Sequence, residues 1–273
     1  LIIVRLDGLM KNCFRLVLLI LLPVSFSLLA CGNNEGQNLI LKAKNEWING
    51  KNHSAIEQFK TILKKYPSDR YAEEALFRLG EIFHFSLNNS EQAITYFQEV
   101  KKLNKGGEFG FDAQKYIAEI MEFTFKNYDQ AIIEYQNLIN EFDQPMKHAD
   151  HQYRIASIYI KKQNYNQALA EYEVLLERYP ESLRIEETQF KIIETLYTLN
   201  RCSDVQDYFE HFFEIFPGSH YLNEINFILA SCLEEQGKLK EAYNKFMSLK
   251  NKYIYPVLLK MKMESLEKRI KKK

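Results

Sequence analysis

The sequence has no excess of charge of either sign, since its 273 residues include 36 lysines and arginines and 36 aspartates and glutamates. This balance excludes a general electrostatic attraction to nucleic acid. The sequence also lacks a glycine-rich phosphate loop, a nucleophile elbow and a cysteine pair at zinc-binding spacing. No segment alternates apolar and polar residues over the length of a strand. We therefore predict a helical protein with no catalytic residues, cofactor or metal, rather than an enzyme.

The nearest approach to a metal site is His148 with His151, which have Asp150 between them. Residues three apart share one face of a helix, so both imidazoles could reach one ion. A zinc site needs at least one more protein ligand, and no nearby residue clearly supplies it. We interpret the two histidines as part of an exposed polar helix start.

The most informative pattern that is present is an internal repeat. A small residue is followed four positions later by an aromatic residue, and the intervals between successive small residues are 38, 38, 37, 37 and 37. A fixed period in this range is typical of a solenoid, whose units bury their apolar faces against their neighbours. The six pairs, with valine replacing alanine in the fifth, are Ala55/Phe59, Ala93/Phe97, Ala131/Tyr135, Ala168/Tyr172, Val205/Phe209 and Ala242/Phe246.

Two further features recur in register with these pairs. Twelve residues after the small residue, Pro67, Pro180 and Pro217 each end a predicted helix. Twelve or thirteen residues before it, a second small residue lets two helix axes approach closely, and only Ile193 departs from this rule. The combined pattern resembles the tetratricopeptide repeat over about residues 38–252. The second small residues are Ala43, Gly80, Ala118, Ala156 and Ala230.

The resemblance and the apolar periodicity together predict an all-α, tetratricopeptide-like α-solenoid of about six helix pairs. A last helix after Pro256, within the basic segment 253–273, is expected to cap the open end of the stack. We interpret the exposed lysines of this capping helix as solvated, and contact with anionic lipid or nucleic acid is the alternative. The first helices are expected at 38–49, 70–86, 110–126, 147–162, 184–199 and 219–236, and the second helices at 53–65, 89–103, 128–141, 165–178, 202–215 and 239–251.

The N-terminal 30 residues have the features of a bacterial leader. The apolar run from Leu16 to Ala30 follows Lys11 and Arg15, and it suits a signal peptide better than a membrane span. It ends in Leu28-Leu29-Ala30-Cys31, which resembles a lipobox. The resemblance implies cleavage before Cys31 and acylation of its thiol, with residues 31–37 as a short lipidated tether. We expect residues 1–9 to precede the natural start of this leader.

Two cysteines remain in the predicted solenoid once Cys31 is assigned to lipid. Cys202 begins the second helix of the fifth repeat, and Cys232 lies in the first helix of the sixth. An oxidising compartment permits a disulfide between neighbouring helices. Both positions also suit small buried residues, and we favour this alternative because disulfide geometry is strict. The sequence therefore leaves open whether they are bridged.

Two columns of residues recur on the first helices at positions that, in the tetratricopeptide family, line the concave face. One column is mainly aromatic and the other mainly acidic. We advance the hypothesis that they form a groove for an extended or helical peptide. The alternative is that the aromatic residues pack between repeats and the acids complement the helix dipoles. The candidate groove residues are Phe77, Tyr153, Phe190 and Phe227 with Glu74, Asp112, Asp150, Glu187 and Glu224.

The lipobox, the short tether and the repeat ends together resemble the outer-membrane assembly lipoproteins of the BamD type. Tyr66-Pro67-Ser68 and Tyr179-Pro180-Glu181-Ser182 carry this likeness. It implies a lipid-anchored scaffold at the outer membrane that faces the periplasm and binds a β-barrel insertase or unfolded outer-membrane proteins, and no nucleic acid. The alternative is another envelope lipoprotein, such as a pilotin-like protein or an adaptor for peptidoglycan enzymes.

Overall fold

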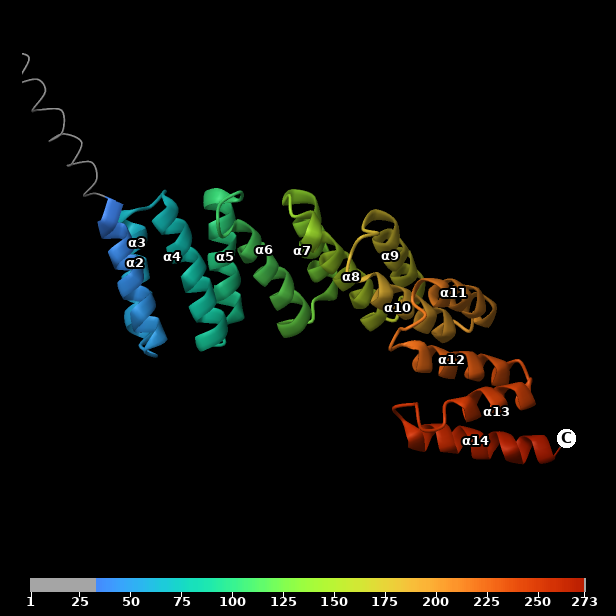
Figure 1. The fold of residues 1–273 in the computed structure, drawn as a ribbon. Coiled ribbons are helices and arrows are strands. Elements are labelled where there is room, and N and C mark those ends of the chain that lie inside the picture. The colour runs from blue at the N-terminus through green and yellow to red at the C-terminus, as the bar shows by residue number, and fades with distance from the viewer. Residues whose placement is uncertain (1–32, 273) are drawn as a thin grey trace, which may run out of the picture. The chain divides into compact units, whose positions relative to one another are not determined.

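The computed structural model describes residues 33–272, and every regular element within them is helical (Figure 1). Thirteen α-helices are joined by short turns, and two of them continue into a π-helical turn, named η2 and η3. The chain divides into two compact units, one ending at Ile120 and the other beginning at Met121. The predicted all-α class is confirmed, and no described helix is long and apolar enough to cross a membrane.

The first unit stacks successive antiparallel helices, and each packs on the next along the chain from α2 to α6 (Figure 1). Its core includes Ile40, Phe59, Ile62 and Leu79, all fully buried. The elements are α2 (Asn33–Ile48), α3 (Asn52–Lys65), α4 (Arg70–Glu81), η2 (Ile82–Ser86), α5 (Ser90–Asn104) and α6 (Gly110–Glu119).

The second unit repeats the arrangement, and the last helix packs against α13. The turn η3 (Ile120–Thr124) begins at its boundary, so the two predicted helices of the third repeat belong to different units. The α-helices of the second unit are α7 (Tyr128–Glu141), α8 (Pro145–Lys161), α9 (Tyr165–Arg178), α10 (Ile185–Thr198), α11 (Cys202–Ile215), α12 (Leu222–Glu235), α13 (Leu239–Ser248) and α14 (Pro256–Lys271).

The small and aromatic residues of the repeat pattern form the core, as predicted. All five alanines of the pairs and Val205 are fully buried. At Gly80, an added Cβ would lie 2.5 Å from the ring of Phe97, so only glycine allows that ring to approach helix α4. The recurring small residues are therefore explained by the close approach of an aromatic ring from the second helix.

The fifth repeat departs from the predicted Val205/Phe209 pair. Phe209 is only partly buried, and Phe212, three residues later, is fully buried instead. At the position of Phe212 the other repeats carry Ile, Val or Leu. The larger side chains of Val205 and Phe212 fill the core volume that an alanine and an aromatic fill elsewhere, because protein cores conserve total volume better than the size of each residue.

A residue with positive φ follows the first helix of every repeat, and these residues recur at the same five intervals as the core pairs. The two longer intervals are those that contain η2 and η3. There the amides of Asn89 and Asn127 donate to carbonyls six residues back, whereas in a 37-residue repeat Asn164 donates to a carbonyl five residues back. The extra residue is thus taken up as a π-turn. The positive-φ residues are Gly50, Asn88, Lys126, Gln163, Asn200 and Gly237.

The junction after α5 lacks the proline seen in other repeats and is held by a buried carboxylate. Glu73 is 5% exposed, and it accepts hydrogen bonds from the Phe109 amide at 2.9 Å and the Asn104 side chain at 3.0 Å. Gly107 leaves room for this carboxylate, because an added Cβ would lie 2.2 Å from it. A glycine and a buried acid therefore replace the proline turn.

Cys202 and Cys232 form a disulfide, with their Cα atoms 5.5 Å apart. This separation lies in the usual range. Cys202 is the first residue of α11, and Cys232 is buried in α12. Of the two possibilities left open by the sequence, the bridged one is present. The predicted leader and the lipidation site Cys31 lie outside the described residues.

Candidate functional site

The aromatic column of the predicted groove lies largely inside the repeat packing. Phe77, Tyr153 and Phe190 are 4%, 8% and 6% exposed, and Phe227 is partly buried. Three of these rings contact the aromatic residue of their own repeat, as in the 5.7 Å separation of Tyr153 from Tyr172. Phe190 instead stacks on Tyr221 at 4.3 Å. A ligand would reach only the edges of these rings.

The acidic column is partly exposed, and several of its members have intramolecular partners. Glu74 lies 3.1 Å from the Lys44 ammonium group, and Asp150 lies 2.7 Å from Arg184. Asp112 is exposed. In Glu224, one carboxylate oxygen is buried without a hydrogen-bond partner. These acidic residues therefore make separate polar contacts, each near its own first helix.

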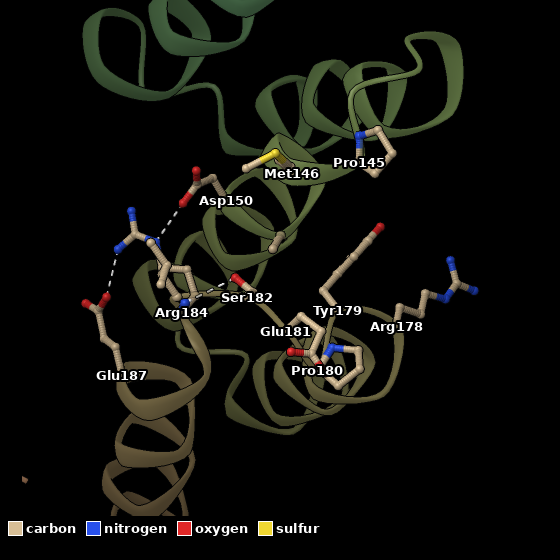
Figure 2. A pocket seen from close by; sticks show the side chains of 12 residues that line it. Pro145, Met146, Asp150, Arg178, Tyr179, Pro180, Glu181, Ser182, Arg184 and Glu187 are labelled. Atoms are coloured by element: carbon tan, nitrogen blue, oxygen red, sulfur yellow. Dashed lines mark hydrogen bonds and ion pairs between the residues drawn. The ribbon is translucent and has the colours of Figure 1, made fainter.

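One pocket of about 660 Å³ in the second unit includes two of the nine predicted groove residues, Asp150 and Glu187. Figure 2 shows it between the start of α8 and the turn that joins α9 to α10. Its volume falls within the usual range for ligand sites. The lining residues are Pro145, Met146, Ala149, Asp150, Arg178, Tyr179, Pro180, Glu181, Ser182, Leu183, Arg184 and Glu187.

Local sequence explains the walls of this pocket. Pro145 occupies the first turn of α8, where its missing amide hydrogen costs no helical bond. On the opposite side, Pro180 ends α9, because the preceding Tyr179 must leave the α region. The Ser182 hydroxyl then accepts a hydrogen bond from the Arg184 amide at 3.1 Å and fixes the entry into α10. The pocket is thus shaped by two proline-defined helix ends.

Two exposed apolar side chains at this pocket carry no signal in the repeat pattern. Met146 is 94% exposed and Leu183 is 103% exposed, and both line the pocket. The sequence analysis did not identify them. The one signal in the sequence that could have identified them is that each is an apolar residue among polar neighbours near the start of a helix. Exposed apolar residues beside a pocket mark a surface suited to contact with another molecule.

Arg184 organises the charge in the pocket. Its guanidinium donates to Asp150 and to Glu187, both at 2.7 Å (Figure 2). It also lies 4.9 Å from the centre of the Tyr153 ring. The hydrogen bond with Asp150 raises the pKa of Arg184 most strongly. Burial tends to raise the pKa of Glu187, but hydrogen bonds from Tyr153 and Arg184 hold it below its usual value. The Glu187 carboxylate therefore stays ionised at neutral pH.

The lining residues predict which ligand the pocket can accept. Met146, Leu183 and Tyr179 offer apolar contact, and the charged lining consists of three carboxylates and two arginines. No group of at least three histidine, cysteine, aspartate or glutamate side chains in the described chain could hold a metal ion. The arrangement suits an apolar side chain flanked by a polar or basic group, as on a protein surface.

The histidine pair considered as a metal site has a structural role instead. His148 contacts the Phe142 carbonyl through Nε2 at 2.8 Å. His151 is 6% exposed and stacks on Tyr135 at 5.8 Å, so the expectation of an exposed position is wrong for this residue. His151 lies on the buried side of α8, where its ring packs against the ring of Tyr135.

A second charged centre was missed entirely by the sequence analysis. The Glu122 side chain is fully buried on η3 and contacts Arg154 at 2.6 Å, Lys161 at 2.7 Å and the Tyr135 hydroxyl at 2.8 Å. Burial acts to raise the pKa of Glu122, but the hydrogen bonds from Lys161, Arg154 and Tyr135 prevail and lower it. The centre ties the π-turn to α7 and α8.

Comparison with known families gives two matches on separate parts of the chain. Residues 143–253 match the YfiO model, described as outer membrane lipoprotein, and residues 40–108 match a tetratricopeptide repeat model. The pocket lies wholly within the first of these stretches. No curated protein matches the chain.

Solved structures support the same fold. A tetratricopeptide repeat protein from Parabacteroides merdae is 19% identical, with 78% of each chain covered and a TM-score of 0.50. The apo form of RapI is 13% identical over 86% of this chain and 75% of its own, with a TM-score of 0.52. The protein therefore has a tetratricopeptide-type helical repeat fold, and it resembles the BamD-type outer membrane lipoproteins.

Proposed function

We propose that the protein is a lipid-anchored scaffold of the cell envelope that binds other proteins during outer-membrane protein assembly, at the periplasmic face of the outer membrane. The observation that carries this proposal is the match of residues 143–253 to an outer membrane lipoprotein family. The lipobox ending at Cys31 supports the anchor. Acylation at this position would attach the solenoid to the bilayer through a short tether.

In this proposal the pocket at α8 and α10 is a docking point for a protein partner. An apolar side chain of the partner would lie against Met146 and Leu183, and a neighbouring cation would face Glu181 and Asp150. Rigid proline-flanked walls favour such binding, because little conformational freedom is lost when the partner docks. Glu224 would offer a further acidic contact in the second unit, and Glu74 and Asp112 would offer separate acidic contacts on the first unit.

Affinity capture from detergent-solubilised envelopes tests the function. The native protein and a Cys31→Ala form are compared, and the captured proteins are identified by mass spectrometry. Recovery of a large β-barrel insertase with its accessory lipoproteins is expected. Recovery of a secretin or of peptidoglycan enzymes would replace assembly by another envelope role. A native protein whose intact mass shows no acyl chains relative to the Cys31→Ala form would contradict the lipid anchor.

Two exposed residues allow the docking point to be tested without disturbing the core. The Met146→Asp/Leu183→Asp variant is expected to fold normally and to capture at least about tenfold less partner, because truncating central apolar contacts costs more than 1.4 kcal/mol at typical hot spots. The matched control is Ile48→Asp/Ile215→Asp, which changes two exposed apolar residues by the same charge. Equal capture by both variants would place the contact elsewhere.

A further inference from the structure

The contacts of the last helix with α12 and α13 determine which of its faces is exposed to solvent. Leu259 and Leu266 are buried in the core that α14 shares with α13. Lys262 and Arg269 turn inward to Glu234 of α12, at 2.7 Å and 2.5 Å. These two basic residues are therefore held against the repeat, unlike the solvated face expected from the sequence.

An apolar cluster lies on the free side of α14 and at the corner that precedes it. It covers the N-terminal turns of the helix and includes one tyrosine. No other stretch of eight residues in the described chain exposes as many large apolar side chains. The members, with their exposed fractions, are Ile254 (61%), Tyr255 (58%), Val257 (72%), Leu258 (42%) and Met261 (63%).

The same segment concentrates the positive charge of the chain. Residues 250–273 contain nine basic and two acidic side chains, a net charge of +7, while the whole chain is neutral. Lys260, Lys268, Lys271 and Lys272 are exposed. Of the two acids, Glu264 lies 3.8 Å from Lys260, and Glu267 accepts a hydrogen bond from Tyr243 at 2.7 Å. The free face therefore combines apolar surface with uncompensated lysine charge.

We propose that this face of α14 is a membrane-contact site that binds anionic phospholipid headgroups, in addition to any lipid carried at Cys31. The apolar cluster would enter the headgroup region, while Lys268, Lys271 and Lys272 contact phosphate groups. Tyr255 is an exposed member of the cluster, and tyrosine suits a membrane–water boundary.

The kind of cation distinguishes a lipid surface from a protein partner. Eight of the nine basic residues in this segment are lysines. Protein interfaces are depleted in lysine and enriched in arginine, because lysine is strongly hydrated and flexible. Clustered lysines beside a short apolar surface are instead typical of attraction to anionic bilayers. The charge complementarity thus favours phospholipid. This site is independent of the partner bound at the α8–α10 pocket.

Fluorescence of the full chain in vesicles tests the proposal. Met261 is replaced by a genetically encoded, environment-sensitive fluorescent amino acid, and the protein is reconstituted into phosphatidylcholine vesicles with or without phosphatidylglycerol. Emission is expected to shift to the blue only with phosphatidylglycerol. Lys268→Gln/Lys271→Gln/Lys272→Gln should abolish most of the shift, because each lysine near an anionic surface is worth about a fivefold change in binding.

The matched control removes the same charge from exposed lysines of the first unit, as Lys60→Gln/Lys64→Gln/Lys102→Gln, and should keep the shift. An equal shift in both vesicle types, or an equal loss in both triple variants, would overturn the proposal. So would a photo-crosslinking amino acid at Val257 that captures a protein rather than phospholipid in intact cells.

Discussion

At the scale of single residues, Glu122 is the clearest case of a charge whose contribution to stability depends on its surroundings. Its side chain is fully buried, whereas those of Arg154 and Lys161 remain 32% and 39% exposed. A buried carboxylate is costly unless donors surround it. Here two cations and a tyrosine hydroxyl satisfy it, and the three partners come from two different helices.

The Glu122→Gln substitution is expected to lower the free energy of unfolding by about 2–3 kcal/mol, because two cations and a hydroxyl lose their anionic acceptor. Urea unfolding followed by circular dichroism measures this change. Glu99→Gln removes a carboxylate from the exposed ion pair with Lys102 and should cost at most about 1 kcal/mol. Equal losses in both variants would show that Glu122 contributes nothing specific.

The depressed pKa of Glu122 also predicts a pH dependence. The stabilisation is fully present above the unfolded-state pKa and is lost as the pH falls through the lower folded-state pKa. Unfolding experiments from about pH 7 to about pH 3 should therefore show stability falling on the acid side of the ordinary glutamate pKa of about 4.3. Glu122→Gln should fall less steeply, and parallel curves would contradict the assignment.

At the scale of elements, the ends of the first helices set the repeat length. A residue in the left-handed backbone conformation follows each of these helices, and only two of the six residues are glycines. Lys126 and Gln163 hold the same backbone conformation at a steric cost that glycine does not have. Helix termination in these repeats is therefore imposed by packing and by the following helix cap rather than by local preference.

Replacing Gln163 by glycine is expected to raise the free energy of unfolding by about 0.5–1 kcal/mol, because the left-handed conformation is then unstrained. Gly237→Ala is the reverse control and should lower stability by about 1 kcal/mol. No atom lies within 4 Å of the added Cβ at Gly237, so the loss would come from the backbone alone. Thermal unfolding measures the change in stability of both variants. Changes of the same sign in Gln163→Gly and Gly237→Ala would contradict the explanation.

The π-turns and the site show where sequence reasoning stops. Core positions and helix ranges could be predicted, because small and aromatic residues recur at a fixed period. The π-turns could not, since one additional residue looks the same in a sequence whether a loop or a helix absorbs it. Met146 and Leu183 have no periodic partner. Glu122 is separated from Arg154 and Lys161 by more than 30 residues, so its network appears only in three dimensions.

At the scale of the whole molecule, the disulfide is the one covalent cross-link between repeats in the described chain. It joins α11 of the fifth repeat to α12 of the sixth, and both lie in the second unit. Repeat stacks are otherwise held by contacts between neighbours, so they can open locally from an end. The sequence left this bridge undecided because spacing along the chain does not determine the distance between two cysteines.

Removal of this link by Cys202→Ser/Cys232→Ser is expected to destabilise the second unit by about 3–4 kcal/mol, the loop-closure entropy of a loop of about 30 residues. Reductant should lower the free energy of unfolding of the unmodified protein by the same amount. It should leave that of the double variant unchanged. If the stability of the unmodified protein is the same with and without reductant, the two thiols are free.

The position of the disulfide also matters for a protein that is pulled. If one end of the stack is attached to a bilayer and a partner draws on the other, force passes through each repeat in turn. The bridge between Cys202 and Cys232 encloses a sequence separation of 30 residues. If these helices unfold under force, the segment enclosed by the disulfide cannot extend. The chain therefore lengthens by on the order of 100 Å less than it would without the bridge. The fifth and sixth repeats would then resist the applied force as one mechanical unit.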